Sequence, residues 1–76
     1  MDQVQAAIAK VYREEAGKIT ATLIRVLGNF EAAEDVLQEA VAVALTQWSK
    51  AGVPDKPGAW LVTTAKNRAI DQIRMS

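Results

Sequence analysis

Apolar residues recur every three or four positions along most of this 76-residue chain, and two short segments containing glycine, asparagine or proline divide the pattern into three. That period places the apolar residues of each part on one face of an α-helix. Gly28 suits the left-handed conformation that ends many helices, and Pro54 blocks helix continuation after Gly52. The sequence therefore predicts helices over residues 3–27, 30–48 and 57–74, packed as an all-α, compact three-helix bundle with no sheet.

The predicted helix ends carry residues suited to those positions. Asn29 is among the best N-cap residues, and we expect Asp55 to cap the third helix with Pro57 in its first turn. A single domain this small buries only about 60% of its unfolded surface, so all three apolar faces should share one core. The residues expected to face inward are Val4, Ile8, Val11, Ile19, Leu23, Val26, Ala33, Val36, Leu37, Ala40, Ala44, Leu61, Ala65, Ala69 and Ile73.

The composition argues against several classes of function. The chain contains no cysteine and no histidine, which removes disulfides, thiolate metal sites and the commonest general base. No glycine-rich phosphate loop or nucleophile–base set is present, so we expect neither an enzyme nor a cofactor. A magnesium site on the acidic second helix is a weak alternative. No apolar run approaches the roughly 20 residues of a membrane span, and no signal pattern precedes the first helix, so the expected location is cytoplasmic, with no membrane partner.

The charges are segregated although they sum to zero. Residues 1–28 carry a net charge of +1, residues 29–48 carry −4 and residues 50–76 carry +3. One interpretation is two partners of opposite charge, and the other is that the blocks attract each other within the fold. The outer surface of the third helix, with Lys66, Asn67, Arg68, Asp71, Gln72 and Arg74, is of a kind that can lie on a phosphate backbone.

Three blocks of the sequence, in this order and spacing, carry a family resemblance. They are YREEAGKITATLIRVLGNF over residues 12–30, AEDVLQEAVAVALTQW over 33–48 and GVPDKPGAWLVTTAKNRAIDQIR over 52–74. Together they resemble region 2 of an extracytoplasmic-function (ECF) sigma factor of the bacterial sigma-70 family. The GVPDKPGAWL phrase is most similar to the ECF subgroup whose members carry a long C-terminal extension.

The resemblance implies that residues 33–39 dock on the β′ clamp helices of the RNA polymerase core. The matched contact residues are Glu34, Asp35, Gln38 and Glu39. Positions 35, 38 and 39 lie on one side of a helix, and a basic partner would be attracted to them. The alternative is a solvated acidic surface without a partner.

The resemblance also implies contact with the non-template strand of the promoter −10 element. Residues 49–56 match the segment that captures an unstacked base, and the third helix matches the segment that follows the strand. The candidate DNA-binding residues are Lys50, Lys56, Lys66, Asn67, Arg68 and Arg74, and the alternative for Asn67 is a structural hydrogen bond. We expect Asp71 to orient Arg68 or Arg74, and Trp48 and Trp60 to pack in the core.

The resemblance therefore implies a sigma factor domain that recognises and helps to melt the −10 element in transcription initiation. The helical domain that reads the −35 element in a complete sigma factor has no counterpart here, so we expect a single region 2 domain that is a fragment of a longer protein. Many ECF factors are held inactive by an anti-sigma factor, which makes an anti-sigma factor a further candidate partner. The rival interpretation is a helical protein-interaction module without DNA contact, in which the basic surface is inert.

Overall fold

The computed structural model describes residues 3–75, and three helices account for nearly all of them. α1 spans Gln3–Leu27, α2 spans Phe30–Ala51 and α3 spans Pro57–Met75. No strand occurs in this part of the chain. The predicted all-α bundle without a sheet is therefore confirmed.

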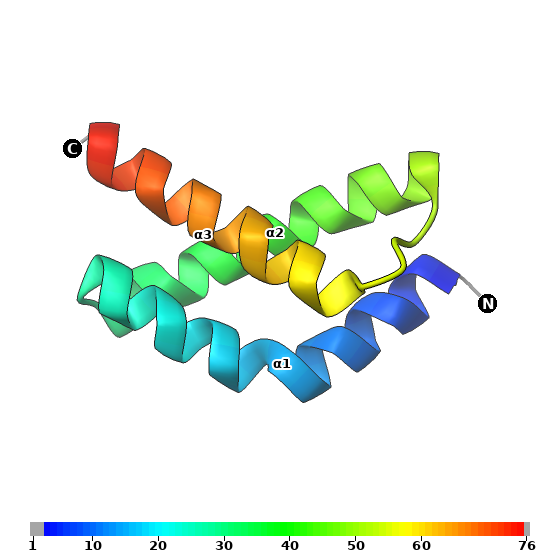
Figure 1. Cartoon of the computed structure of the whole chain (residues 1–76), viewed down its shortest axis with the longest axis horizontal. Coiled ribbons are helices and arrows are strands. Elements are labelled where there is room, and N and C mark those ends of the chain that lie inside the picture. Colours follow the sequence, from blue (N-terminus) through cyan, green and yellow to red (C-terminus); the bar gives the residue numbers. More distant parts are fainter. Residues whose placement is uncertain (1–2, 76) are drawn as a thin grey trace.

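The helices are arranged as a hairpin with a third helix laid across it. α1 and α2 meet at one end of the molecule and diverge toward the other, and α3 crosses in front of α2 (Figure 1). Each helix contacts the other two. The first turn of α3 lies against the first half of α1, where Pro57 and Gly58 line a groove with Ala7 and Val11. α2 therefore packs against both α1 and α3, and its remaining surface is open to solvent between them.

The turn between α1 and α2 has the geometry that its two residues favour. Gly28 has a φ of 72°, and its N–H donates to the carbonyl of Ile24 at 2.6 Å. Asn29 is extended, and its Oδ1 accepts a hydrogen bond from the N–H of Ala32 at 3.0 Å. The predicted helix end at Gly28 and the predicted N-cap at Asn29 are both confirmed, and together they reverse the chain within two residues.

The second connection is shorter than the sequence predicted. α2 continues to Ala51, so the loop comprises residues 52–56 and not 49–56. The helix ends only where Gly52 adopts a φ of 94° and its N–H donates to the carbonyl of Trp48 at 2.9 Å. The predicted cap at Asp55 is also wrong, because Lys56 is the residue that immediately precedes α3 and its carbonyl accepts from the N–H of Trp60 at 3.0 Å.

The core contains most of the residues that the apolar periodicity selected. All five predicted inward-facing residues of α2 are buried, and Leu61, Ala65 and Ala69 are buried on α3. Ile8 and Val26 are only partly covered, and Ile73 is wrong, because its side chain is 49% exposed. The last turns of α3, which include Ile73, diverge from the α1–α2 hairpin (Figure 1).

Both tryptophans belong to the packing, as predicted. Trp48 is 3% exposed and joins Val4 and Ala44 in a second apolar cluster at the open end of the hairpin. The ring of Trp60 meets Trp48 edge to face, with centroids 5.2 Å apart and planes at 68°. That geometry is favoured for aromatic pairs, and it fixes α3 against α2 just after the loop.

Candidate functional site

The acidic side chains of α2 form an open surface on the outside of the hairpin. Glu34, Asp35 and Gln38 are exposed, and they occupy adjacent positions over two turns of the helix. The buried residues of the same segment, Val36 and Leu37, hold these turns against the rest of the bundle. The structure therefore presents one amide and two carboxylates together on a rigid element, which is the arrangement that suits docking of a basic partner.

Gln38 is also tied to α1. Its Nε2 donates a hydrogen bond to Oη of Tyr12 at 3.3 Å, although the two residues are 26 positions apart in the sequence. Tyr12 is 37% exposed, so its ring forms part of the same outer surface. Beyond it lies an apolar groove of 440 Å³, lined by Ile8, Ala9 and Leu45 with Arg13 and Gln5 at its edge. The acidic surface of α2 therefore continues onto α1 through Tyr12.

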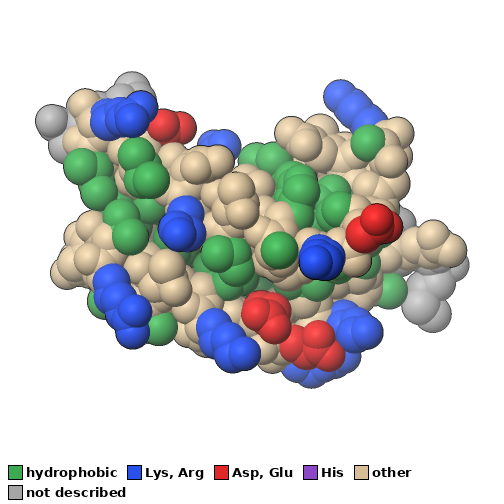
Figure 2. All heavy atoms as spheres, viewed as in Figure 1, with side chains coloured by type: hydrophobic (Ala, Val, Ile, Leu, Met, Phe, Trp, Pro, Cys, Tyr) green, Lys and Arg blue, Asp and Glu red, His purple; other side chains and the backbone are tan. Residues whose placement is uncertain are grey.

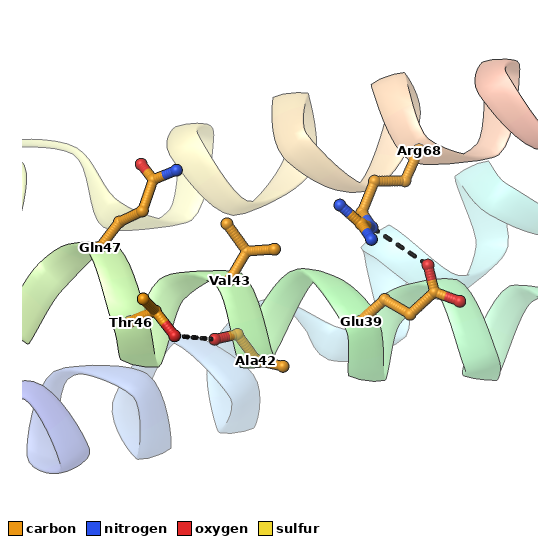
Figure 3. A pocket seen from close by; sticks show the side chains of 6 residues that line it. All are labelled: Glu39, Ala42, Val43, Thr46, Gln47 and Arg68. Atoms are coloured by element: carbon orange, nitrogen blue, oxygen red, sulfur yellow. Dashed lines mark hydrogen bonds and ion pairs between the residues drawn. The ribbon is translucent and has the colours of Figure 1, made fainter.

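Glu39 differs from its acidic neighbours because it is paired within the fold. Its Oε1 accepts from Nε of Arg68 on α3 at 3.0 Å, and the side chains are 42% and 43% exposed. The pair bridges α2 and α3 (Figure 3). This contact joins the acidic block to the basic block. Attraction between the two blocks within the fold was one of the two interpretations of the segregated charges. Glu39, and not Asp71, is the ion partner of Arg68.

The basic candidates on α3 do not share one narrow face. Residues two positions apart lie about 200° apart around a helix, so Lys66 and Arg68 point to opposite edges of α3. Residues seven positions apart nearly coincide, so Asn67 and Arg74 share the outermost side, and all four residues are exposed. Lys and Arg side chains are spread over this surface of the molecule, with hydrophobic side chains between them (Figure 2). The surface is a dispersed array of cations and not one dense basic patch.

The remaining two basic candidates flank the loop. Lys50 lies in the last turn of α2 and not in the loop, and Lys56 immediately precedes α3. Both are exposed, as is Val53 between them at 37%. A cation at the C-terminal end of α2 also complements the negative end of the helix dipole, so Lys50 has a structural role that requires no ligand.

The seam between α2 and α3 holds two shallow grooves that meet the Glu39–Arg68 pair. One, of 430 Å³, runs toward the second half of α2 and is lined by Ala42, Val43, Thr46 and Gln47 (Figure 3). The other, of 280 Å³, runs toward the end of α3 and is lined by Asp71 and Gln72. The ion pair lines both grooves, so a ligand that follows the seam must contact it.

Some residues at these surfaces were not found by sequence reasoning. Tyr12, Thr46 and Gln47 were not among the predicted site residues. Nothing in the local pattern signals Tyr12, because its polar partner comes from another helix. Gln47 follows Val43 by four residues, so the two side chains are neighbours on the helix surface. This spacing could have been read from the sequence.

Other site types find little support in the described part of the chain. Among residues 3–75 there is no group of three or more acidic side chains placed to hold a metal ion. None of the described helices is both long enough and apolar enough to cross a membrane.

Comparison with known proteins identifies the family. Residues 11–76 match the family Sigma-70 region 2. The chain belongs to this family. An uncharacterized protein of Rhizobium meliloti (strain 1021), R00370, is 40% identical over 52 residues, which is 68% of this chain but only 12% of that relative's length. No solved structure gives a significant match.

Membership of the family gives a general role to the surfaces described above. At the level of the family, it implies a sigma-factor-like role in RNA polymerase binding and promoter recognition. The match extends from the middle of α1 through all of α2 and α3, so it includes every candidate residue. Both candidate surfaces therefore lie within the family's region of similarity.

Proposed function

We propose that this chain is the region 2 domain of an ECF-type sigma factor that docks on the β′ clamp helices and binds the non-template strand of the −10 element. The observation that carries the proposal is the open surface of Glu34, Asp35 and Gln38 on a helix whose other side is firmly buried. The domain works in the cytoplasm, with RNA polymerase and promoter DNA as partners and an anti-sigma factor as a candidate regulator.

The physical basis of the docking step is charge complementarity on a preorganised surface. Exposed carboxylates attract a basic helix pair over several ångströms, which speeds encounter and fixes the orientation of the complex. The amide of Gln38 adds a directional donor and acceptor, and its hydrogen bond to Tyr12 limits the rotamers that it samples in the free domain. A partner therefore meets a surface whose shape changes little on binding.

The DNA step combines phosphate contacts with capture of an unpaired base. In this proposal Lys66 and Arg74 neutralise phosphates, Asn67 contacts a base edge, and the loop over residues 52–56 receives the unstacked base. Unpairing and extruding a base costs a few kcal/mol, which binding of the open strand must offset. The cations of α3 are dispersed around the helix, which makes this contact weak in isolation, so the polymerase is needed to hold the domain at the promoter.

The deciding experiment measures binding of the chain to a purified β′ clamp-helix fragment. We expect the Gln38→Ala/Glu39→Ala double variant to lose at least tenfold in affinity. A Gln3→Ala/Glu14→Ala variant removes the same two kinds of group from exposed positions of α1 and should bind as the wild type does. Circular dichroism checks that both variants stay folded.

The outcomes separate the docking proposal from its rival. Absence of binding by the folded wild-type chain would refute docking. Binding to the clamp helices without any affinity for single-stranded −10 DNA, even in the presence of the clamp fragment, would favour a protein-interaction module instead. In that case the triple substitution Lys66→Ala, Arg68→Ala and Arg74→Ala would leave function intact.

A further inference from the structure

The ion pair between Glu39 and Arg68 joins one residue from each of the two proposed surfaces. Glu39 is a candidate polymerase contact on α2, and Arg68 is a candidate phosphate contact on α3. Nε of Arg68 lies 3.0 Å from Oε1 of Glu39, so each group already has a charged partner that an incoming ligand must displace. Both side chains remain more than two-fifths exposed, so an incoming partner can reach either one without unfolding the domain.

The position of the pair gives it a role in both binding events. It lines both grooves along the α2–α3 seam. Glu39 follows Asp35 by four residues on α2, so its carboxylate lies beside the acidic surface formed by Glu34, Asp35 and Gln38. A basic helix that docks on that surface competes with Arg68 for Glu39. A DNA strand that follows α3 competes with Glu39 for Arg68.

We propose that the Glu39–Arg68 pair couples the two surfaces, so that docking of a cationic polymerase helix on Glu39 releases Arg68 to a DNA phosphate. The inference rests on the proposed function and adds an order of events to it. In the free domain the pair lowers the affinity for single-stranded DNA, and engagement of the clamp raises it. Because coupling between two ligands is reciprocal, DNA bound at Arg68 raises the affinity for the clamp by the same factor.

The expected size of the effect follows from the exposure of the pair. Solvent-exposed ion pairs measured by double-mutant cycles correspond to changes in equilibrium constants of about 1.4- to 5-fold. A release of that size adjusts the affinity of the domain without acting as an all-or-none switch. Salt should weaken the coupling, because screening reduces the attraction between the two exposed groups in the free domain.

The test compares Glu39→Gln with a matched loss of charge elsewhere on α2. Glu31→Gln removes the same charge from an exposed position that has no role in the proposed coupling. The probe is a fluorescein-labelled single-stranded oligothymidylate, which reports phosphate contacts without base selectivity. We expect Glu39→Gln to bind it about 1.4- to 5-fold more tightly than Glu31→Gln. The slope of log affinity against log salt should steepen by about 0.7, corresponding to one additional phosphate contact on a single strand.

A second variant, Arg68→Gln, tests whether the effect of Glu39→Gln depends on Arg68. In an Arg68→Gln background, the advantage of Glu39→Gln over Glu31→Gln should disappear, because no cation remains to be released. A saturating β′ clamp-helix fragment should raise the DNA affinity of the wild type by more than it raises that of Glu39→Gln. Equal effects of Glu39→Gln and Glu31→Gln, with no dependence on Arg68, would overturn the coupling while leaving the proposed function in place. Absence of both clamp binding and DNA binding by the wild type would instead refute the proposed function.

Discussion

Substitution of Ala40 by leucine tests how tightly the helices that carry the two surfaces are packed. Ala40 is 0% exposed in the main core, among Leu37, Leu61 and Ala65. Three added carbons would contribute about 2.4 kcal/mol if they entered an empty space, at about 0.8 kcal/mol for each buried CH₂. In a filled core the helices must move apart instead, and overpacking typically costs a net 1–3 kcal/mol.

That cost is large for a domain of this size. A chain of 76 residues has a total unfolding free energy of about 4–11 kcal/mol. A loss of about 2 kcal/mol lowers the melting temperature by about 8–16 °C, since each kcal/mol corresponds to about 4–8 °C for small domains. Because α2 and α3 share this core, the same displacement should also separate Glu39 from Arg68 and remove their coupling.

The assay is urea and thermal unfolding followed by circular dichroism, with Ala42→Leu as the control. Ala42 is exposed on the same helix and borders the 430 Å³ groove, so a leucine there has room. Alanine and leucine have similar helix propensities, so the two substitutions differ mainly in packing. We expect Ala42→Leu to stay within about 0.5 kcal/mol of the wild type. Equal stabilities of the two variants would show that the core around Ala40 is not close-packed and would refute this reasoning.

Three further predictions concern single contacts. Asn29→Ala should cost about 1 kcal/mol of unfolding free energy, while Asn29→Gly should cost only a few tenths, because glycine is tolerated at the N-cap position and alanine is not. Urea unfolding distinguishes the two variants, and equal losses would contradict a capping role. Trp48→Phe should change the unfolding free energy by less than about 1 kcal/mol, measured by urea unfolding. The buried indole Nε1 has no hydrogen-bond partner in the described part of the chain, so its removal offsets the weaker ring contact with Trp60. A loss above about 2 kcal/mol would contradict this balance. Lys66→Gln should reduce the salt dependence of single-stranded DNA binding by about 0.7 in slope, measured by fluorescence anisotropy, and an unchanged slope would remove Lys66 from the interface.

Local chemistry explains why so much of the fold was predictable. The 3.6-residue period placed Leu37, Leu61 and Ala65 in the core, and each is at most 2% exposed. Gly28 and Asn29 specified the first turn because each suits one backbone conformation at that position. The errors fell where local signals compete: Ser49 to Ala51 were assigned to the loop, but nothing in them stops a helix before Gly52 does.

The candidate site was predictable as a set of residues but not as an arrangement. Spacing along α2 placed Asp35 and Gln38 on one exposed side, as the structure has them. Spacing along α3 also allowed Arg68 to pair with Asp71, and the competing partner on α2 could not be read from the chain. Tyr12 was absent from the predicted site for the same reason, since its contact with Gln38 exists only once α1 and α2 pack together.

The sequence by itself determined the three helices, their buried faces and the two blocks of opposite charge, because these depend on residues within a few turns of one another. Only the tertiary structure decided that the two blocks meet through Glu39 and Arg68, which are 29 positions apart. It also decided which side of each helix remains open once its neighbours are in place. A crossing of helices depends on how their side chains interlock, and the periodicity of one helix contains no information about the position of another.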